Sequence, residues 1–244
     1  MSNKVAVVAG GAKGIGRDIA LSMASAGWSI ALCYRKSKKE AESTCKGIES
    51  KGVQALAINC DVSNPKNAYD FVSSVEKEWG RVDALINCAG PYHRINLLDE
   101  TAEGWNEMFD NNLHPLFYLS KAVSKGMIER GFGRIIAFSM ANADKLSSQP
   151  NITAHYIAKS GIIILARSLA TLLAPHGITV NTISPGFIDS GSASADELER
   201  MTRRIPAGYV GSKSDAVALV NYLLSEDAKY VNGANIQISG AWGI

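Results

Sequence analysis

Short apolar runs bounded by glycine, proline or charged residues alternate along this chain with longer stretches in which apolar residues recur at helical spacing. The short runs are typical of strands buried in a parallel sheet, and the longer stretches are typical of helices that pack on it. The pattern predicts strands at residues 5–8, 28–34, 53–60, 82–87, 133–139, 178–184 and 234–239. It predicts helices at residues 15–23, 37–51, 65–79, 104–130, 153–176 and 213–225.

Two of these helices carry further information. Pro115 interrupts the helix predicted at 104–130, so we expect a kink or a break there. The helix at 153–176 has apolar residues on several sides, which predicts burial of more than one face. The alternation of strands and helices predicts one α/β domain over residues 1–244, a doubly wound, mostly parallel seven-stranded sheet with helices on both faces.

The composition is that of an enzyme-sized domain with a sizeable core, since 46% of the residues are hydrophobic and 20% are charged. The net charge of +2 is too small to indicate a nucleic acid or an anionic membrane as partner. We find no signal peptide and no long uncharged apolar span, and therefore expect a cytoplasmic protein. The cysteines lack metal-ligand spacing, which predicts buried free thiols and no metal site, at Cys33, Cys45, Cys60 and Cys88.

A glycine-rich turn joins the first predicted strand to the first predicted helix. Gly10, Gly14 and Gly16 stand in the order G-x-x-x-G-x-G, with Lys13 and Ile15 between them. Glycine allows a positive φ and a close approach of the backbone to a ligand, and the N-terminus of the following helix suits a pyrophosphate. We interpret the turn as a dinucleotide-binding element, and a glycine turn without a ligand is the alternative.

The residues after the second predicted strand indicate which dinucleotide binds. Ligands of such sheets sit outside the carboxyl ends of the strands, where an acidic residue binds the adenosine ribose and an arginine accepts a 2′-phosphate. No Asp or Glu occurs from residue 28 to residue 39, and Arg35 and Lys36 follow the strand, with Lys13 nearby in the glycine turn. The pattern favours NADP(H) over NAD(H), and the alternative is a solvated basic face.

Several motifs occur together in one order along nearly the whole chain. They are Ala9-Gly10-x-x-x-Gly14-x-Gly16, Asn87-Cys88-Ala89-Gly90, Asn112, Lys159-Ser160-Gly161 and Asn181-x-x-x-Pro185-Gly186. In this combination the chain resembles the short-chain dehydrogenase/reductase family. The resemblance implies a Rossmann-type sheet, a nicotinamide cofactor and reversible hydride transfer to a carbonyl.

The resemblance also implies roles for individual residues. Asp61, followed by Val62, would hydrogen-bond the adenine, and the nicotinamide ribose would lie against Lys159. Residues 185–188 would hold the carboxamide, helped by Ser190. The remaining cofactor positions implied in this way are Asn87, Ala89, Gly90, Pro185, Gly186 and Ile188.

The chain departs from the family pattern where the chemistry takes place. The family's catalytic serine aligns with Met140, and Ser139 stands one residue earlier. The family's tyrosine, four residues before its lysine, aligns with His155, and Tyr156 stands three before Lys159. Because positions three and four before Lys159 both lie near its face of a helix, we expect Tyr156 to be the proton donor, with His155 as the alternative. Lys159 and Asn112 would support it, and Ser139 would orient the carbonyl if the strand end shifted by one residue.

The remaining expectations concern substrate, activity and assembly. Tyr92, His93 and Arg94 could contact a substrate, and residues 187–211 form a substrate-loop insertion with a short helix. A 3-oxoacyl thioester, a small ketone, a sugar or a pterin all stay open. The sequence predicts an NADPH-dependent carbonyl reductase or alcohol dehydrogenase, and the alternative is a catalytically impaired NADP(H)-binding sensor or partner subunit. The apolar long helices and the apolar segment 241–244 predict a homo-oligomer, a tetramer.

Overall fold

A seven-stranded parallel sheet forms the centre of the molecule. The computed structural model describes residues 4–189, 191 and 193–243. The strand order is β3-β2-β1-β4-β5-β6-β9, and every neighbouring pair is parallel, as predicted for a doubly wound sheet. The strands are β1 (Val5–Ala9), β2 (Ser29–Tyr34), β3 (Ala55–Asn59), β4 (Ala84–Asn87), β5 (Gly133–Phe138), β6 (Ile178–Pro185) and β9 (Asn235–Ile238).

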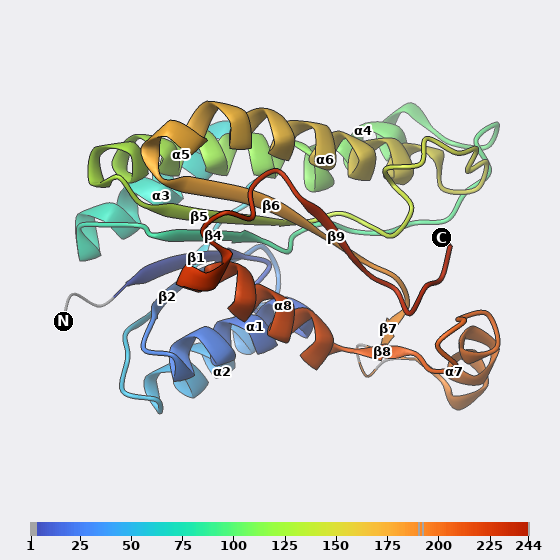
Figure 1. The fold of residues 1–244 in the computed structure, drawn as a ribbon, viewed down its shortest axis with the longest axis horizontal. Coiled ribbons are helices and arrows are strands. Elements are labelled where there is room, and N and C mark those ends of the chain that lie inside the picture. Colours follow the sequence, from blue (N-terminus) through green and yellow to red (C-terminus); the bar gives the residue numbers. More distant parts are fainter. Residues whose placement is uncertain (1–3, 190, 192, 244) are drawn as a thin grey trace.

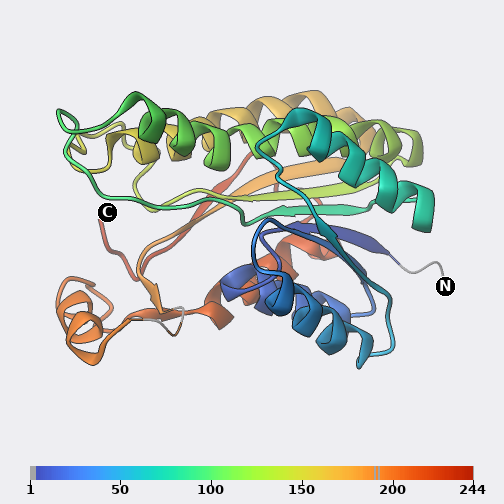
Figure 2. The same ribbon diagram turned by 180° about the vertical axis from the view of Figure 1, so that it is seen from behind.

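Helices cover both faces of the sheet, as Figures 1 and 2 show from opposite sides. One face carries α1 (Gly14–Ser25), α2 (Lys38–Glu49) and α8 (Lys213–Leu224). The other carries α3 (Pro65–Trp79), α4 (Ala102–Asn112), α5 (His114–Arg130) and α6 (Thr153–Leu173), and the short 3-10 helices η1 (Ala174–His176) and η2 (Glu226–Ala228) complete the set. Each face has its own core of fully buried side chains, such as Ile19 and Val220 on the first and Leu119 and Ile162 on the second.

The helical stretch predicted at 104–130 is divided into α4 and α5. Leu113 ends α4, and Pro115 lies in the first turn of α5, where its missing N–H costs no hydrogen bond. This confirms the break expected at Pro115, and it lets Asn112, the last residue of α4, turn toward the ends of the strands. At the other end of α4, the Thr101 hydroxyl caps the helix by accepting from the amide of Gly104.

The helix α6 is buried along much of its length, as its apolar pattern predicts. Together with η1 it is long and apolar enough to cross a membrane by length and composition. Core helices of globular proteins pass the same test, and α6 packs Ile162 and Ala166 against the sheet. We therefore describe α6 as a core helix.

The segment after β6 leaves the sheet and is closed by a small ladder that the sequence did not predict. Strand β7 (Ile188–Asp189) pairs with β8 (Gly211–Ser212), and the short helix expected here is α7 (Ala195–Thr202). The C-terminal tail contacts this segment, because the Ala207 amide donates to the Gly240 carbonyl. The tail thus lies beside the carboxyl ends of the strands (Figure 1).

The tail also contacts the loop that follows β5. The Trp242 and Phe187 ring centroids lie 4.6 Å apart, and Lys145 Nζ donates to the Gly243 carbonyl over 2.8 Å. A Cβ on Gly243 would overlap the Asn142 side chain. The tail therefore connects the loop after β5 with the segment after β6.

Candidate active site

The glycine turn packs tightly against the segment after β4. Gly10 has a φ of +79°, and a Cβ there would lie 3.0 Å from the Ala89 nitrogen. A Cβ on Gly16 would overlap the Gly10 carbonyl oxygen. Glycine is thus required at both positions, because the turn bends back on the first turn of α1 and leaves the backbone accessible to a ligand. Ile15 packs into the core beneath the turn, and Gly14, with a φ of +60°, has open space where a Cβ would stand.

Arg35 extends from the end of β2 toward the end of β3. Its Nη1 lies 3.6 Å from Asp61 Oδ2 and donates to Asn111 Oδ1 over 3.1 Å. Burial works to raise the pKa of Asp61, but hydrogen bonds from Ser63 and the charge of Arg35 outweigh it and hold the pKa below its usual range. Lys36 is exposed beside this pair. The ends of β2 and β3 thus present a carboxylate and at least two cations to one place.

The neighbouring positions frame this place. Val62 is buried beneath Asp61, and Ala89 packs against the same core. Lys13 is exposed in the glycine turn. The structure therefore brings the predicted adenosine-side residues to the carboxyl ends of neighbouring strands.

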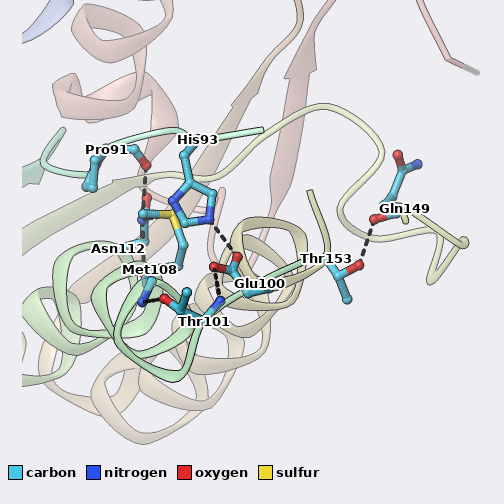
Figure 3. Close-up of polar contacts among 9 residues, drawn as sticks. Pro91, His93, Glu100, Thr101, Met108, Asn112, Gln149 and Thr153 are labelled. Carbon is cyan, nitrogen blue, oxygen red and sulfur yellow. Dashed lines mark hydrogen bonds and ion pairs between the residues drawn. The ribbon is translucent and has the colours of Figure 1, made fainter. Parts of the chain in front are cut away.

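Buried amides line the ends of β4 and α4. Asn112 Nδ2 donates to the carbonyls of Met108 and Pro91 over 2.9 and 3.1 Å, whereas its Oδ1 has no partner (Figure 3). Both amide atoms of Asn87 are likewise buried without a partner. Gly90 has a φ of +151°, and a Cβ there would overlap Asn112 Oδ1 and approach Lys159 Nζ to 3.4 Å. Unpaired buried amides are costly, so they mark a place where a polar ligand fits.

Lys159 lies in the middle of this group. Its Nζ donates to the Phe138 carbonyl over 2.9 Å, and burial lowers its pKa to about 8. Its ammonium group stands beside Gly90 and the unpaired oxygen of Asn112. The donor set of one ammonium and two amides fits the hydroxyl-rich ribose and the carboxamide of a nicotinamide cofactor.

The segment after β6 closes the other side of the site. The Pro185 carbonyl accepts from the Ala141 amide over 2.9 Å, and the Gly186 amide donates to the Ile238 carbonyl over 3.0 Å. A Cβ on Gly186 would lie 2.9 Å from Ser239, so this crossing also requires glycine. Ile188 belongs to β7, and Ser190 lies outside the described residues.

His155 takes the position four residues before Lys159 on α6. Its ring meets the Tyr92 ring edge to face, with the centroids 5.1 Å apart, and its Nδ1 is buried without a partner. Burial and the charge of Lys159 lower its pKa to about 4, so the imidazole is neutral at pH 7. His155 therefore lies in the site but is not in its charged, proton-donating form at pH 7.

Tyr156 points elsewhere, and this placement argues against its predicted role. Its hydroxyl donates to the Asn142 carbonyl over 2.6 Å and accepts from the Ser147 amide over 3.2 Å. The ring is buried with Ala143 and Ile163, and Met140 packs against the same small cluster. The hydroxyl thus holds the loop after β5 in place.

Ser139 is also directed away from the predicted role. It is buried, and its hydroxyl donates to the backbone carbonyl of Lys159 over 2.8 Å. The strand end does not shift by one residue, because β5 ends at Phe138 and the Ser139 amide still donates to β6 at Ile183. The hydroxyls of Ser139 and Tyr156 are thus both hydrogen-bonded to backbone carbonyls.

A pair that the sequence did not indicate closes the site on the side of α4. His93 Nε2 lies 2.7 Å from Glu100 Oε2, and Glu100 Oε1 accepts from the Thr101 amide (Figure 3). The sequence singled out His93 as a loop residue but gave no signal for Glu100, since a pair across an irregular loop follows no periodicity. Among the described residues, no group of three or more His, Cys, Asp and Glu side chains is placed to hold a metal ion.

Comparisons with known proteins agree with this geometry. A family model described as Enoyl-(Acyl carrier protein) reductase matches residues 10–241. The chain is 35% identical over 242 residues to the 3-oxoacyl-(acyl-carrier-protein) reductase FabG of Staphylococcus epidermidis, with 98% of each chain covered. Among solved structures, it is similar to a putative short-chain alcohol dehydrogenase of Sinorhizobium meliloti 1021, with a TM-score of 0.91, 28% identity and coverage of 99% of this chain and 97% of the other. It is also similar to the acetoin dehydrogenase of Enterobacter cloacae, with a TM-score of 0.90, 30% identity and coverage of 99% and 96%.

Proposed function

Because the chain belongs to the short-chain dehydrogenase/reductase family of oxidoreductases, we propose that it is an NADP(H)-dependent enzyme that transfers hydride between nicotinamide and a carbonyl or alcohol substrate. The observation that carries this proposal is the group formed by Lys159, the buried and unpaired amide of Asn87 and the unpaired Oδ1 of Asn112. A structural role alone leaves these amide atoms without hydrogen bonds, whereas a bound cofactor would satisfy them. When bound, the reduced nicotinamide supplies the hydride.

The chain's own residues bind and orient in this scheme. The turn from Gly10 to Gly16 offers backbone N–H groups to the pyrophosphate, and Asp61 offers its carboxylate to the adenine. The Lys159 ammonium and the Asn112 side chain would hold the nicotinamide ribose. Pro185 and Gly186 would hold the carboxamide.

We assign the cofactor preference to the cations after β2. Arg35 and Lys36, with Lys13 across the glycine turn, suit the 2′-phosphate of NADP(H). We expect NADPH to bind at least about tenfold more tightly than NADH, a ratio that needs only about 1.4 kcal/mol. Dissociation constants for both cofactors are measured at fixed salt with the parent protein, with Arg35→Asp and with Lys229→Asp. Lys229 follows η2 near the opposite end of the sheet and serves as the charge-matched control. A parent protein that prefers NADH would contradict this assignment.

The substrate class is the second part of the proposal. We propose a 3-oxoacyl thioester or a small ketone, because the relatives carry the names of a 3-oxoacyl reductase and an acetoin dehydrogenase. NADPH oxidation is followed by absorbance with a 3-oxoacyl thioester, acetoin, a quinone and, because of the family model's description, an enoyl thioester. Turnover of the enoyl thioester alone would contradict carbonyl reduction.

The engaged hydroxyls of Tyr156 and Ser139 keep one other function in view, a cofactor-binding sensor or partner subunit without turnover. Such a protein would bind NADPH as tightly as an enzyme does. The two functions are distinguished by the panel above, because the sensor would leave every substrate unreduced while the cofactor dissociation constant stays in the micromolar range.

We further propose that the protein is a cytoplasmic homotetramer. Helices α5 and α6 expose large apolar side chains on their outer surfaces, which a partner subunit would cover, namely Phe117, Ile128, Ile157, Ile164 and Leu172. Light scattering at micromolar concentration is the test. A monomer mass there would rule the assembly out.

A further inference from the structure

A carbonyl that accepts hydride must also gain a proton, and the donor must stand within hydrogen-bond reach of its oxygen. The hydroxyls of Tyr156 and Ser139 are bound to backbone groups of the loop after β5 and of α6. His155 is neutral at pH 7, because burial and Lys159 disfavour its charged form. None of these three side chains is therefore placed and charged to donate the proton.

His93 is a further titratable side chain close to His155. His93 lies on the loop after β4, in which three consecutive residues are tied to the site. The Pro91 carbonyl accepts from Asn112, and the His93 ring is paired with Glu100 (Figure 3). The Tyr92 ring packs on His155. His93 is close enough to His155 for its charge to lower the pKa of that residue. About a third of its side chain is exposed, so His93 can exchange protons with solvent.

The carboxylate behind His93 is built into the fold. The Glu100 side chain is only 7% exposed, and its Oε1 accepts from the Thr101 amide over 3.2 Å. The space for it exists because residue 104 is glycine, since a Cβ there would overlap Glu100 Oε1. A buried carboxylate that contacts one ring nitrogen fixes the orientation of an imidazole and stabilises its charged form, the arrangement known from Ser-His-Asp sites.

We propose that His93, oriented by Glu100, is the acid that protonates the substrate oxygen, and this inference rests on the proposed carbonyl reductase function. In the charged ring, Nε2–H donates to Glu100 Oε2 and Nδ1–H faces the substrate. As hydride adds to the carbonyl carbon, the electron pair of the C=O π bond moves to oxygen. The Nδ1–H bond breaks, a new O–H bond forms, and the neutral imidazole regains its proton from water. In the oxidative direction the neutral ring accepts the alcohol proton.

The test compares His93→Gln, Glu100→Gln and the matched control His114→Gln with the parent protein. His114 on α5 pairs with Asp110 on α4 over 2.9 Å, but the side chains of both residues are substantially exposed. We expect His93→Gln to lower kcat by about a hundredfold or more while the NADPH dissociation constant stays unchanged, and His114→Gln to change neither. Glu100→Gln should lower kcat while the KM for the substrate stays near the parental value, and Glu100→Asp, which keeps the carboxylate, should recover part of the loss. Free imidazole should restore part of the activity of His93→Ala.

Each other outcome has a definite meaning. A His93→Gln variant with parental kcat, a Glu100→Gln variant with parental kcat, or a His93→Ala variant that imidazole does not rescue would refute the role of His93 and leave the reductase function intact. A parent protein that binds NADPH but reduces no carbonyl would refute the reductase function and the role of His93 together.

Discussion

Replacing Tyr156 by phenylalanine separates structural support from catalysis in this site. The hydroxyl donates to the Asn142 carbonyl and accepts from the Ser147 amide, and the side chain is 5% exposed. Its removal leaves both backbone groups without this partner, which costs about 1–3 kcal/mol of the free energy of unfolding. For a chain of this size, each kcal/mol lowers Tm by roughly 2–4 °C. Because no acid is lost, we expect kcat to stay within about threefold of the parent value.

The assay pairs thermal or denaturant unfolding with kcat at saturating NADPH, at one fixed protein concentration. Tyr230→Phe is the control, since its side chain is 98% exposed and its loss should change stability by less than about 0.5 kcal/mol. A Tyr156→Phe variant with parental stability and a kcat reduced by about a hundredfold would refute this reasoning and establish Tyr156 as the proton donor.

Three further predictions concern residues of α1 and α6 that line the candidate site. Gly16→Ala should weaken NADPH binding and destabilise the fold by about 1–3 kcal/mol, because the new Cβ would overlap the Gly10 carbonyl oxygen. Gly14→Ala places its Cβ in open space and should cost only about 1–2 kcal/mol of backbone strain. NADPH titrations and unfolding curves compare the two variants. Lys159→Met should abolish turnover yet raise the free energy of unfolding at pH 7 by up to about 3 kcal/mol. The reason is that the pKa of Lys159 in the folded protein, about 8, lies below the usual 10.5, so the buried ammonium destabilises the fold below pH 8. The gain should vanish above pH 10.5, and a loss of stability at pH 7 would contradict the prediction. For His155, whose folded pKa of about 4 lies below 6.5, the parent should lose stability as pH falls from 6.5 to 4, and unfolding curves of His155→Gln should be flatter over this window.

The sequence predicts the parts of this site that depend on short-range spacing. The glycine turn follows a strand and opens a helix, so its position at the strand ends is determined by the order of elements. His155 and Lys159 share a helix face because four residues separate them. Pro115 breaks the helix between α4 and α5 because its ring cannot occupy a helix interior.

The parts that the sequence did not predict depend on irregular backbone. Whether Tyr156 faces Lys159 or the loop after β5 is decided by Asn142, whose φ of +68° turns its carbonyl toward the tyrosine hydroxyl. The pair of His93 and Glu100 depends on the path of the irregular loop between β4 and α4 and on the absence of a side chain at Gly104. Neither feature follows a sequence periodicity, so the proximity of these side chains could not be predicted from the sequence.

The position of the C-terminal tail has a practical consequence for protein production. Lys145 holds the Gly243 carbonyl, and Trp242 packs on Phe187, so the tail lies between the loop that Tyr156 supports and the segment that closes the site. An affinity tag or fusion partner added at the C-terminus would lie beside the candidate active site and could disturb the contacts of Trp242 and Gly243. The first strand begins at Val5, at the amino ends of the strands and thus on the opposite side of the sheet (Figure 1). Kinetic work on this protein therefore calls for a tag on the N-terminal side, where added polypeptide lies far from the chemistry.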